Sequence, residues 1–137
     1  MSSAESHIRH RIVVLLKRHR LDPVSVENPV HPGTPDLNYL HGWIELKQVA
    51  RWPSRGSTPL RVPTYTQQQR VWAKRRRQAG GLCYLLLRVA EDWLLFDGGW
   101  ASAHLGYATA SELIAASLGY WPRRLNEEEL VTCLLAT

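Results

Sequence analysis

The stretch from 36 to 47 restricts the fold of this chain more than any other part of it. Two short runs that favour strands, 36–40 and 43–47, are separated only by His41-Gly42. A glycine-containing break of this length between alternating runs is typical of a tight turn, so we expect a β-hairpin. Rigid turn residues precede the hairpin at 31–35, the sequence HPGTP.

Alternation along the second strand gives the hairpin two different faces. Residues two apart on a strand point to the same face, about 7 Å from each other. Glu45 and Lys47 therefore share one face. Ile44 and Leu46 point the other way, into a core. Asp36 begins the neighbouring strand, so we expect it beside Glu45.

Periodicity and helix-breaking residues predict the rest of the chain. The expected elements are a helix at 3–20, a strand at 24–26, a helix at 67–79, strands at 82–89 and 93–96, and helices at 108–118 and 126–136. This order predicts an α/β or α+β fold in which helices flank a central mixed sheet. A chain of 137 residues with only two cysteines fits one domain, residues 1–137, in a reducing cytoplasm.

The positive charge of the chain is concentrated in one region. The formal net charge is +5, but residues 51–90 contain nine basic residues and no acidic residue. Such a segment is typical of a surface that binds nucleic acid, and a solvated helix face is the alternative. Trp52 either stacks on a base or anchors its loop. The candidate nucleic-acid contacts are Arg51, Arg55, Arg61, Arg70, Lys74, Arg76 and Arg77.

The charged face of the hairpin has the composition of a metal-dependent hydrolase. Carboxylates such as Asp36 and Glu45 are preferred ligands of Mg²⁺, and Lys47 can orient or deprotonate water or neutralise charge on a phosphate. Glu5 lies on the inward stripe of the first helix. The alternatives are a surface charge pair for Glu45 and Lys47, and a favourable helix-dipole position for Glu5.

The sequence Pro35-Asp36…Glu45-Leu46-Lys47 resembles the signature of the PD-(D/E)xK (restriction-endonuclease-like) nuclease superfamily. The preceding helix and the following glutamine-containing helix are similar in layout to the VRR-NUC and phage Holliday junction resolvase families. The resemblance implies an α-β-β-β-α-β nuclease core at about 3–96 and a C-terminal helical extension at 97–137. It implies catalytic roles for Asp36, Glu45, Lys47, Glu5 and Gln69, with Gln68 as the alternative glutamine.

The same resemblance implies an activity and its partners. We expect a Mg²⁺-dependent endonuclease, also active with Mn²⁺, whose metal ligands are Asp36, Glu45 and Glu5. Its substrate would be a Holliday junction or other branched DNA, met in repair or recombination in a bacterial or phage-infected cell. We expect a homodimer with no membrane partner and no nucleotide cofactor. The alternatives are a non-catalytic nucleic-acid-binding protein on the same scaffold and a basic protein-interaction module.

Overall fold

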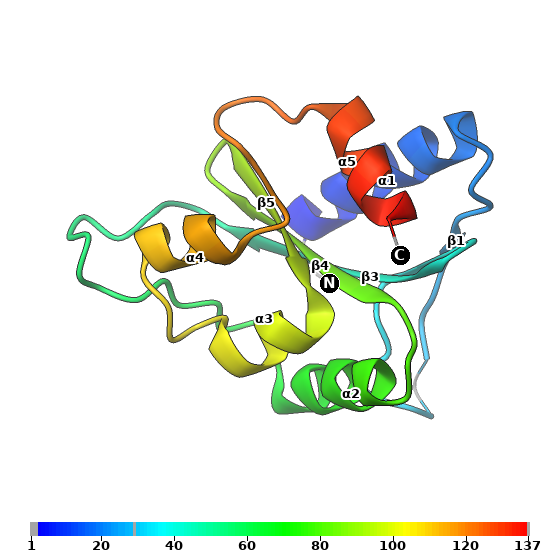
Figure 1. Cartoon of the computed structure of the whole chain (residues 1–137), viewed down its shortest axis with the longest axis horizontal. Coiled ribbons are helices and arrows are strands. Elements are labelled where there is room, and N and C mark those ends of the chain that lie inside the picture. The colour runs from blue at the N-terminus through cyan, green and yellow to red at the C-terminus, as the bar shows by residue number, and fades with distance from the viewer. Residues whose placement is uncertain (1–2, 29, 137) are drawn as a thin grey trace.

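A six-stranded sheet forms the centre of the molecule in the computed structural model, which describes residues 3–28 and 30–136 (Figure 1). The strands lie in the order of the chain, and only β3 and β4 are parallel neighbours. The strands are β1 (Val24–Ser25), β2 (Leu37–Tyr39), β3 (Gly42–Val49), β4 (Cys83–Val89), β5 (Asp92–Asp97) and β6 (Gly119–Trp121). The helices are α1 (Ser3–Arg18), α2 (Gln67–Gln78), α3 (Gly98–His104), α4 (Ala110–Ala116) and α5 (Glu127–Leu135).

Helices cover both faces of the sheet. The helices α1 and α5 lie together on one face, and α2, α3 and α4 lie on the other (Figure 1). Alternation along β4 supplies both cores, because Leu86 packs with the α1 and α5 side while Leu85 and Leu87 pack with α3 and α4. The predicted mixed sheet with flanking helices is therefore confirmed.

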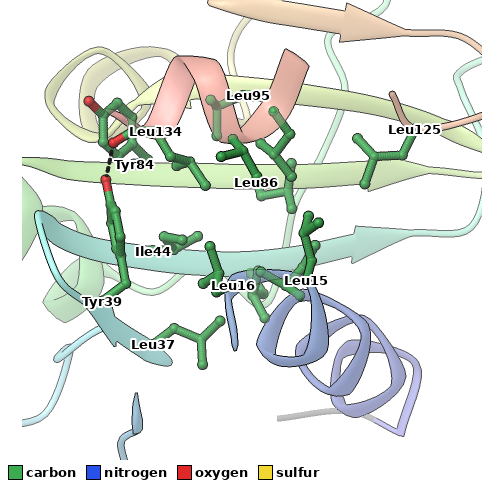
Figure 2. Close-up of a cluster of buried hydrophobic side chains, with 14 of the residues drawn as sticks. Leu15, Leu16, Leu37, Tyr39, Ile44, Tyr84, Leu86, Leu95, Leu125 and Leu134 are labelled. Carbon is green, nitrogen blue, oxygen red and sulfur yellow. Dashed lines mark hydrogen bonds between the residues drawn. The ribbon is translucent and has the colours of Figure 1, made fainter. Parts of the chain in front are cut away.

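The hairpin of β2 and β3 is fixed on the core that α1 and α5 cover. Ile44 and Leu46 are no more than 1% exposed, as their alternation predicts. Figure 2 shows Ile44 among leucines of α1 and of the neighbouring strands. The hydroxyl of Tyr39 donates a 2.6 Å hydrogen bond to the carbonyl oxygen of Leu134 in α5 (Figure 2). The register of the hairpin is thereby tied to the last helix.

The region after 97 differs from the expected helical extension. It contains an additional helix, α3, and an additional strand, β6, which pairs with β5. Asp97 caps α3 by accepting a 3.1 Å hydrogen bond from the backbone N–H of Trp100. Leu105 and Leu113 are fully buried in the second core, so this region completes both the sheet and its packing. None of the described helices has the length and apolar character required to cross a bilayer.

Candidate active site

Asp36 and Glu45 meet just before the start of β2, where β3 continues beyond its partner strand. The antiparallel register pairs Leu37 with Ile44, and one further step places Asp36 opposite Glu45. From Glu45 onward, this edge of β3 no longer pairs with β2, because β2 begins only at Leu37. Asp36 Oδ2 compensates by accepting a 2.9 Å hydrogen bond from the backbone N–H of Leu46. The predicted juxtaposition of the two carboxylates is present in the fold.

Burial and mutual repulsion make this pair difficult to ionise. Burial raises the pKa of Asp36, and the backbone hydrogen bond from Leu46 offsets part of that rise. Burial also raises the pKa of Glu45 well above its ordinary value, and the negative charge of Asp36 adds to the effect. A hydrogen bond between the two carboxyl groups favours protonated Glu45 as the donor. The two groups therefore titrate as a coupled pair.

Lys47 lies against this pair inside the protein. Its Nζ is 3.5 Å from Glu45 Oε1 and donates a 2.8 Å hydrogen bond to the carbonyl oxygen of Thr64. Glu45 and Lys47 are 6% and 3% exposed. The alternative of a solvent-exposed surface charge pair is therefore wrong, because water has been removed from both groups.

Gln69 reaches the same carboxylate from α2. Its Nε2 donates a 3.0 Å hydrogen bond to Glu45 Oε1, while its Oε1 accepts a 2.9 Å hydrogen bond from the backbone N–H of Thr66. The hydroxyl of Thr66 in turn accepts from the backbone N–H of Gln69. This capping box fixes which end of the amide faces Glu45. Gln68 is exposed, so the structure selects Gln69.

A glycine turn holds α2 close to the hairpin. Gly33 has φ +93, a conformation that other residues rarely adopt. A Cβ atom built there would lie 2.4 Å from the carbonyl oxygen of Gln68. The turn that leads into Asp36 therefore packs directly on the first turn of the helix that carries Gln69.

Glu5 is buried on the inward stripe of α1, as predicted, but it has other partners. Its Oε2 lies 3.3 Å from the backbone nitrogen of Gln48 and 3.5 Å from the hydroxyl of Thr64, both of which donate to it. Its charge contributes to the raised pKa of Asp36. Within the described residues, no three His, Cys, Asp or Glu side chains form a group suited to a metal. The structure brings two of the three predicted ligands, Asp36 and Glu45, into direct contact.

The donor set of this pair fits Mg²⁺. That ion is typically bound through one or two carboxylates, with water and phosphate oxygens as its other ligands. A divalent cation between Asp36 and Glu45 would also relieve the repulsion that raises their pKa values. These two residues would hold the metal, and the charge of Glu5 would add to the negative potential at Asp36.

Thr64 is the site residue that sequence reasoning missed. Its carbonyl oxygen holds Lys47 and its hydroxyl contacts Glu5, so one loop residue joins both groups. In the sequence it reads only as a candidate cap for the following helix, whose cap is Thr66. The only sequence signal for it is its place just before that helix.

The candidate nucleic-acid contacts fall into two groups. Arg70 donates hydrogen bonds of 3.1 and 2.6 Å to the carbonyl oxygens of Ser102 and Leu105, so its guanidinium secures α3. Arg77 pairs with Asp97 at 2.8 Å. The remaining candidates are exposed, namely Arg51, Arg55, Arg61, Lys74 and Arg76.

Trp52 has an anchoring contact within its basic loop. Its indole nitrogen donates a 2.8 Å hydrogen bond to Asp92 Oδ2. This bond ties the loop that carries Arg51 and Arg55 to the start of β5, as the anchoring alternative predicts.

Comparison with known proteins adds no assignment to this geometry. The chain matches no protein-family model, and no curated protein shows significant sequence similarity to it.

Proposed function

We propose that this protein is a Mg²⁺-dependent endonuclease that hydrolyses phosphodiester bonds of branched DNA, such as a Holliday junction. The observation that carries the proposal is the buried contact of Asp36 with Glu45, joined by Lys47 and Gln69. Two neighbouring carboxylates that resist ionisation are costly to a fold at neutral pH. Such perturbed groups are characteristic of functional sites.

Each residue of the site has a defined part in this chemistry. Asp36 and Glu45 would hold the metal, which when bound acidifies a water molecule and stabilises negative charge on the scissile phosphate. Lys47 is held by Thr64, with its ammonium beside Glu45. It would orient the attacking water or neutralise charge developing on the phosphate. Gln69 fixes the orientation of the Glu45 carboxylate and is a positioning residue.

The exposed basic residues support DNA as the substrate. Arg51, Arg55 and Arg61 lie in the loop that follows β3, directly after the site. Phosphate contacts of this kind position a duplex without reading its sequence. We therefore propose that the protein recognises DNA by its shape. We also propose a homodimer, which would supply two sites for paired nicks.

Cleavage assays with defined DNA structures test the proposal. Labelled four-way junction, flap, single-stranded and linear duplex DNA are incubated with Mg²⁺ or Mn²⁺, with Asp36→Asn as the control. We expect the wild-type protein to cut the branched substrates and the variant to cut none. DNA binding by both proteins without cleavage would instead support a non-catalytic binding protein. Absence of DNA binding would support a protein-interaction module.

A further inference from the structure

Two tryptophans continue the site along β3 and α2. Trp43 lies two residues before Glu45, so it points to the same face of the sheet, about 7 Å away. On α2, Trp72 follows Gln69 at helical spacing and faces the same strand. The rings of Trp43 and Trp72 meet edge to face, with centroids 5.3 Å apart. The two tryptophans therefore lie beside the site, on the same strand as Glu45 and the same helix as Gln69.

A cleft of about 320 Å³ opens beside this aromatic pair. Its walls include His31, Thr34, Trp43, Trp72, Arg75 and Arg76, and no acidic side chain of the described chain lines it. We call it the tryptophan cleft. The cleft lies next to the site along β3, because Trp43 lines it and lies two residues before Glu45 on the same strand.

The two arginines of the tryptophan cleft are prepared for an anion. The guanidinium carbon of Arg76 lies 4.6 Å from the ring centre of Trp72 and 5.8 Å from that of Trp43. This cation–π packing orients the group without using its N–H donors. Arg75 and Arg76 are exposed, and neither forms an ion pair within the part of the chain that the structure describes. Their charge is therefore available to a phosphate.

We propose that the tryptophan cleft binds an unpaired nucleotide of the DNA strand that is cut. The base would stack at the half-buried ring of Trp43, and Arg75 and Arg76 would hold the adjacent phosphate. A base within a duplex has no free face for such stacking, so the cleft selects DNA that is single-stranded next to the scissile bond. This inference rests on the proposed nuclease function and narrows its substrate, because it favours branched DNA with single-stranded arms, such as a flap or fork, over a fully paired four-way junction.

Binding measured without metal separates this inference from catalysis. Fluorescence anisotropy in EDTA compares a labelled fork, which has single-stranded arms, with a blunt duplex of the same length. We expect the wild-type chain to prefer the fork. Trp43→Leu should weaken fork binding by about 5- to 150-fold, the range for loss of one stacked base, with little change for the duplex. Trp43→Phe keeps a stacking ring and should retain most of the preference.

Two arginine variants complete the test. Arg75→Ala changes an exposed side chain and should lower fork affinity, whereas Arg124→Ala, the same change outside the cleft, should not. Equal fork-to-duplex ratios in folded wild type, Trp43→Leu and Arg75→Ala would overturn the inference. If the wild-type protein cleaves branched DNA but shows no preference for the fork, the proposed role of the tryptophan cleft is refuted and the proposed nuclease function is not. A preference for the fork that depends on Trp43, without cleavage of any DNA, would instead refute the proposed nuclease function.

Discussion

At the scale of single residues, Asp36 and Glu45 lower the stability of the fold at neutral pH, because their carboxyl groups are buried beside each other. The pKa values of Asp36 and Glu45 are higher in the folded protein than their ordinary values. The folded state therefore binds more protons than the unfolded state in the range between those values. The contribution of this pair to stability is fully present below the ordinary pKa and is lost as pH rises through the raised ones. At neutral pH the pair opposes folding.

Removing one charge should reveal this cost. Asn at position 36 keeps an oxygen to accept the N–H of Leu46 and removes the repulsion on Glu45. We expect Asp36→Asn to melt at a higher temperature than wild type at pH 7–8, with the difference vanishing as pH falls towards 3.8, the ordinary Asp value. The cleavage rate should fall by more than the roughly 10- to 100-fold loss that is typical when a residue that only supports a metal ligand is changed. Thermal unfolding across pH measures the first effect, and a lower melting temperature at pH 8 would contradict it.

The two adjacent glutamines provide a matched pair. Gln69→Ala removes the hydrogen bond to Glu45 and half of the capping box, whereas Gln68→Ala alters an exposed neighbour. We expect Gln69→Ala to lower cleavage by about 10- to 100-fold and stability by about 1 kcal/mol. Rates measured over a series of Mg²⁺ concentrations should show a weaker apparent metal affinity only for Gln69→Ala. Equal losses of cleavage rate in both variants would show that Gln69 has no specific role in the site.

At the scale of elements, the Gly33 turn sets the distance between the hairpin and α2. An alanine there would need φ +93 and a Cβ atom 2.4 Å from a backbone oxygen of α2. We expect Gly33→Ala to cost about 1–3 kcal/mol of stability and to reduce cleavage through displacement of Gln69. Gly56→Ala is the control, because a Cβ at Gly56 would have no neighbour within 4 Å. Chemical denaturation measures both, and equal stabilities would show that the turn does not restrain α2.

Local pattern was sufficient for the elements that carry the site. The alternation at 43–47 predicted which side chains of β3 enter the core, and the stripe on α1 predicted that Glu5 is buried. Helix α3 was missed because Gly98 and Gly99 are poor helix formers. Its start depends on the Asp97 cap, and a Cβ at Gly98 would lie 2.4 Å from Cys83 Sγ. Such close approaches exist only after the sheet has formed.

Tertiary packing also assigned roles that charge alone could not. Arg70 and Arg61 look alike in the sequence, yet Arg70 is committed to carbonyl groups of the α3 region and Arg61 is exposed. Thr64 joins Lys47 and Glu5 through contacts that no spacing rule predicts. Strand β6 is only three residues long and is defined by its pairing with β5.

At the scale of the whole molecule, the exposed basic residues should make DNA affinity depend strongly on salt. Each phosphate contact contributes a slope of about −0.9 to a plot of log affinity against log salt concentration for duplex DNA. We expect Arg51→Ala, Arg55→Ala and Arg61→Ala each to reduce that slope by up to about 0.9. Arg70→Ala should instead lower the melting temperature, because it releases two carbonyl groups. Titrations at several salt concentrations measure the slopes. An unchanged slope in all three variants would show that DNA does not bind at these three arginines.

The bond between Tyr39 and Leu134 has a consequence for synthesis of the chain. The strand that follows Asp36 packs under a helix that leaves the ribosome 95 positions later. Until then, the leucines and isoleucines of α1 and β3 lack part of their cover, and the acidic pair lacks a fixed frame. A nascent chain should therefore remain an incomplete and aggregation-prone intermediate until α5 emerges. The site of the proposed nuclease would in this way lack its final frame until α5 has been translated.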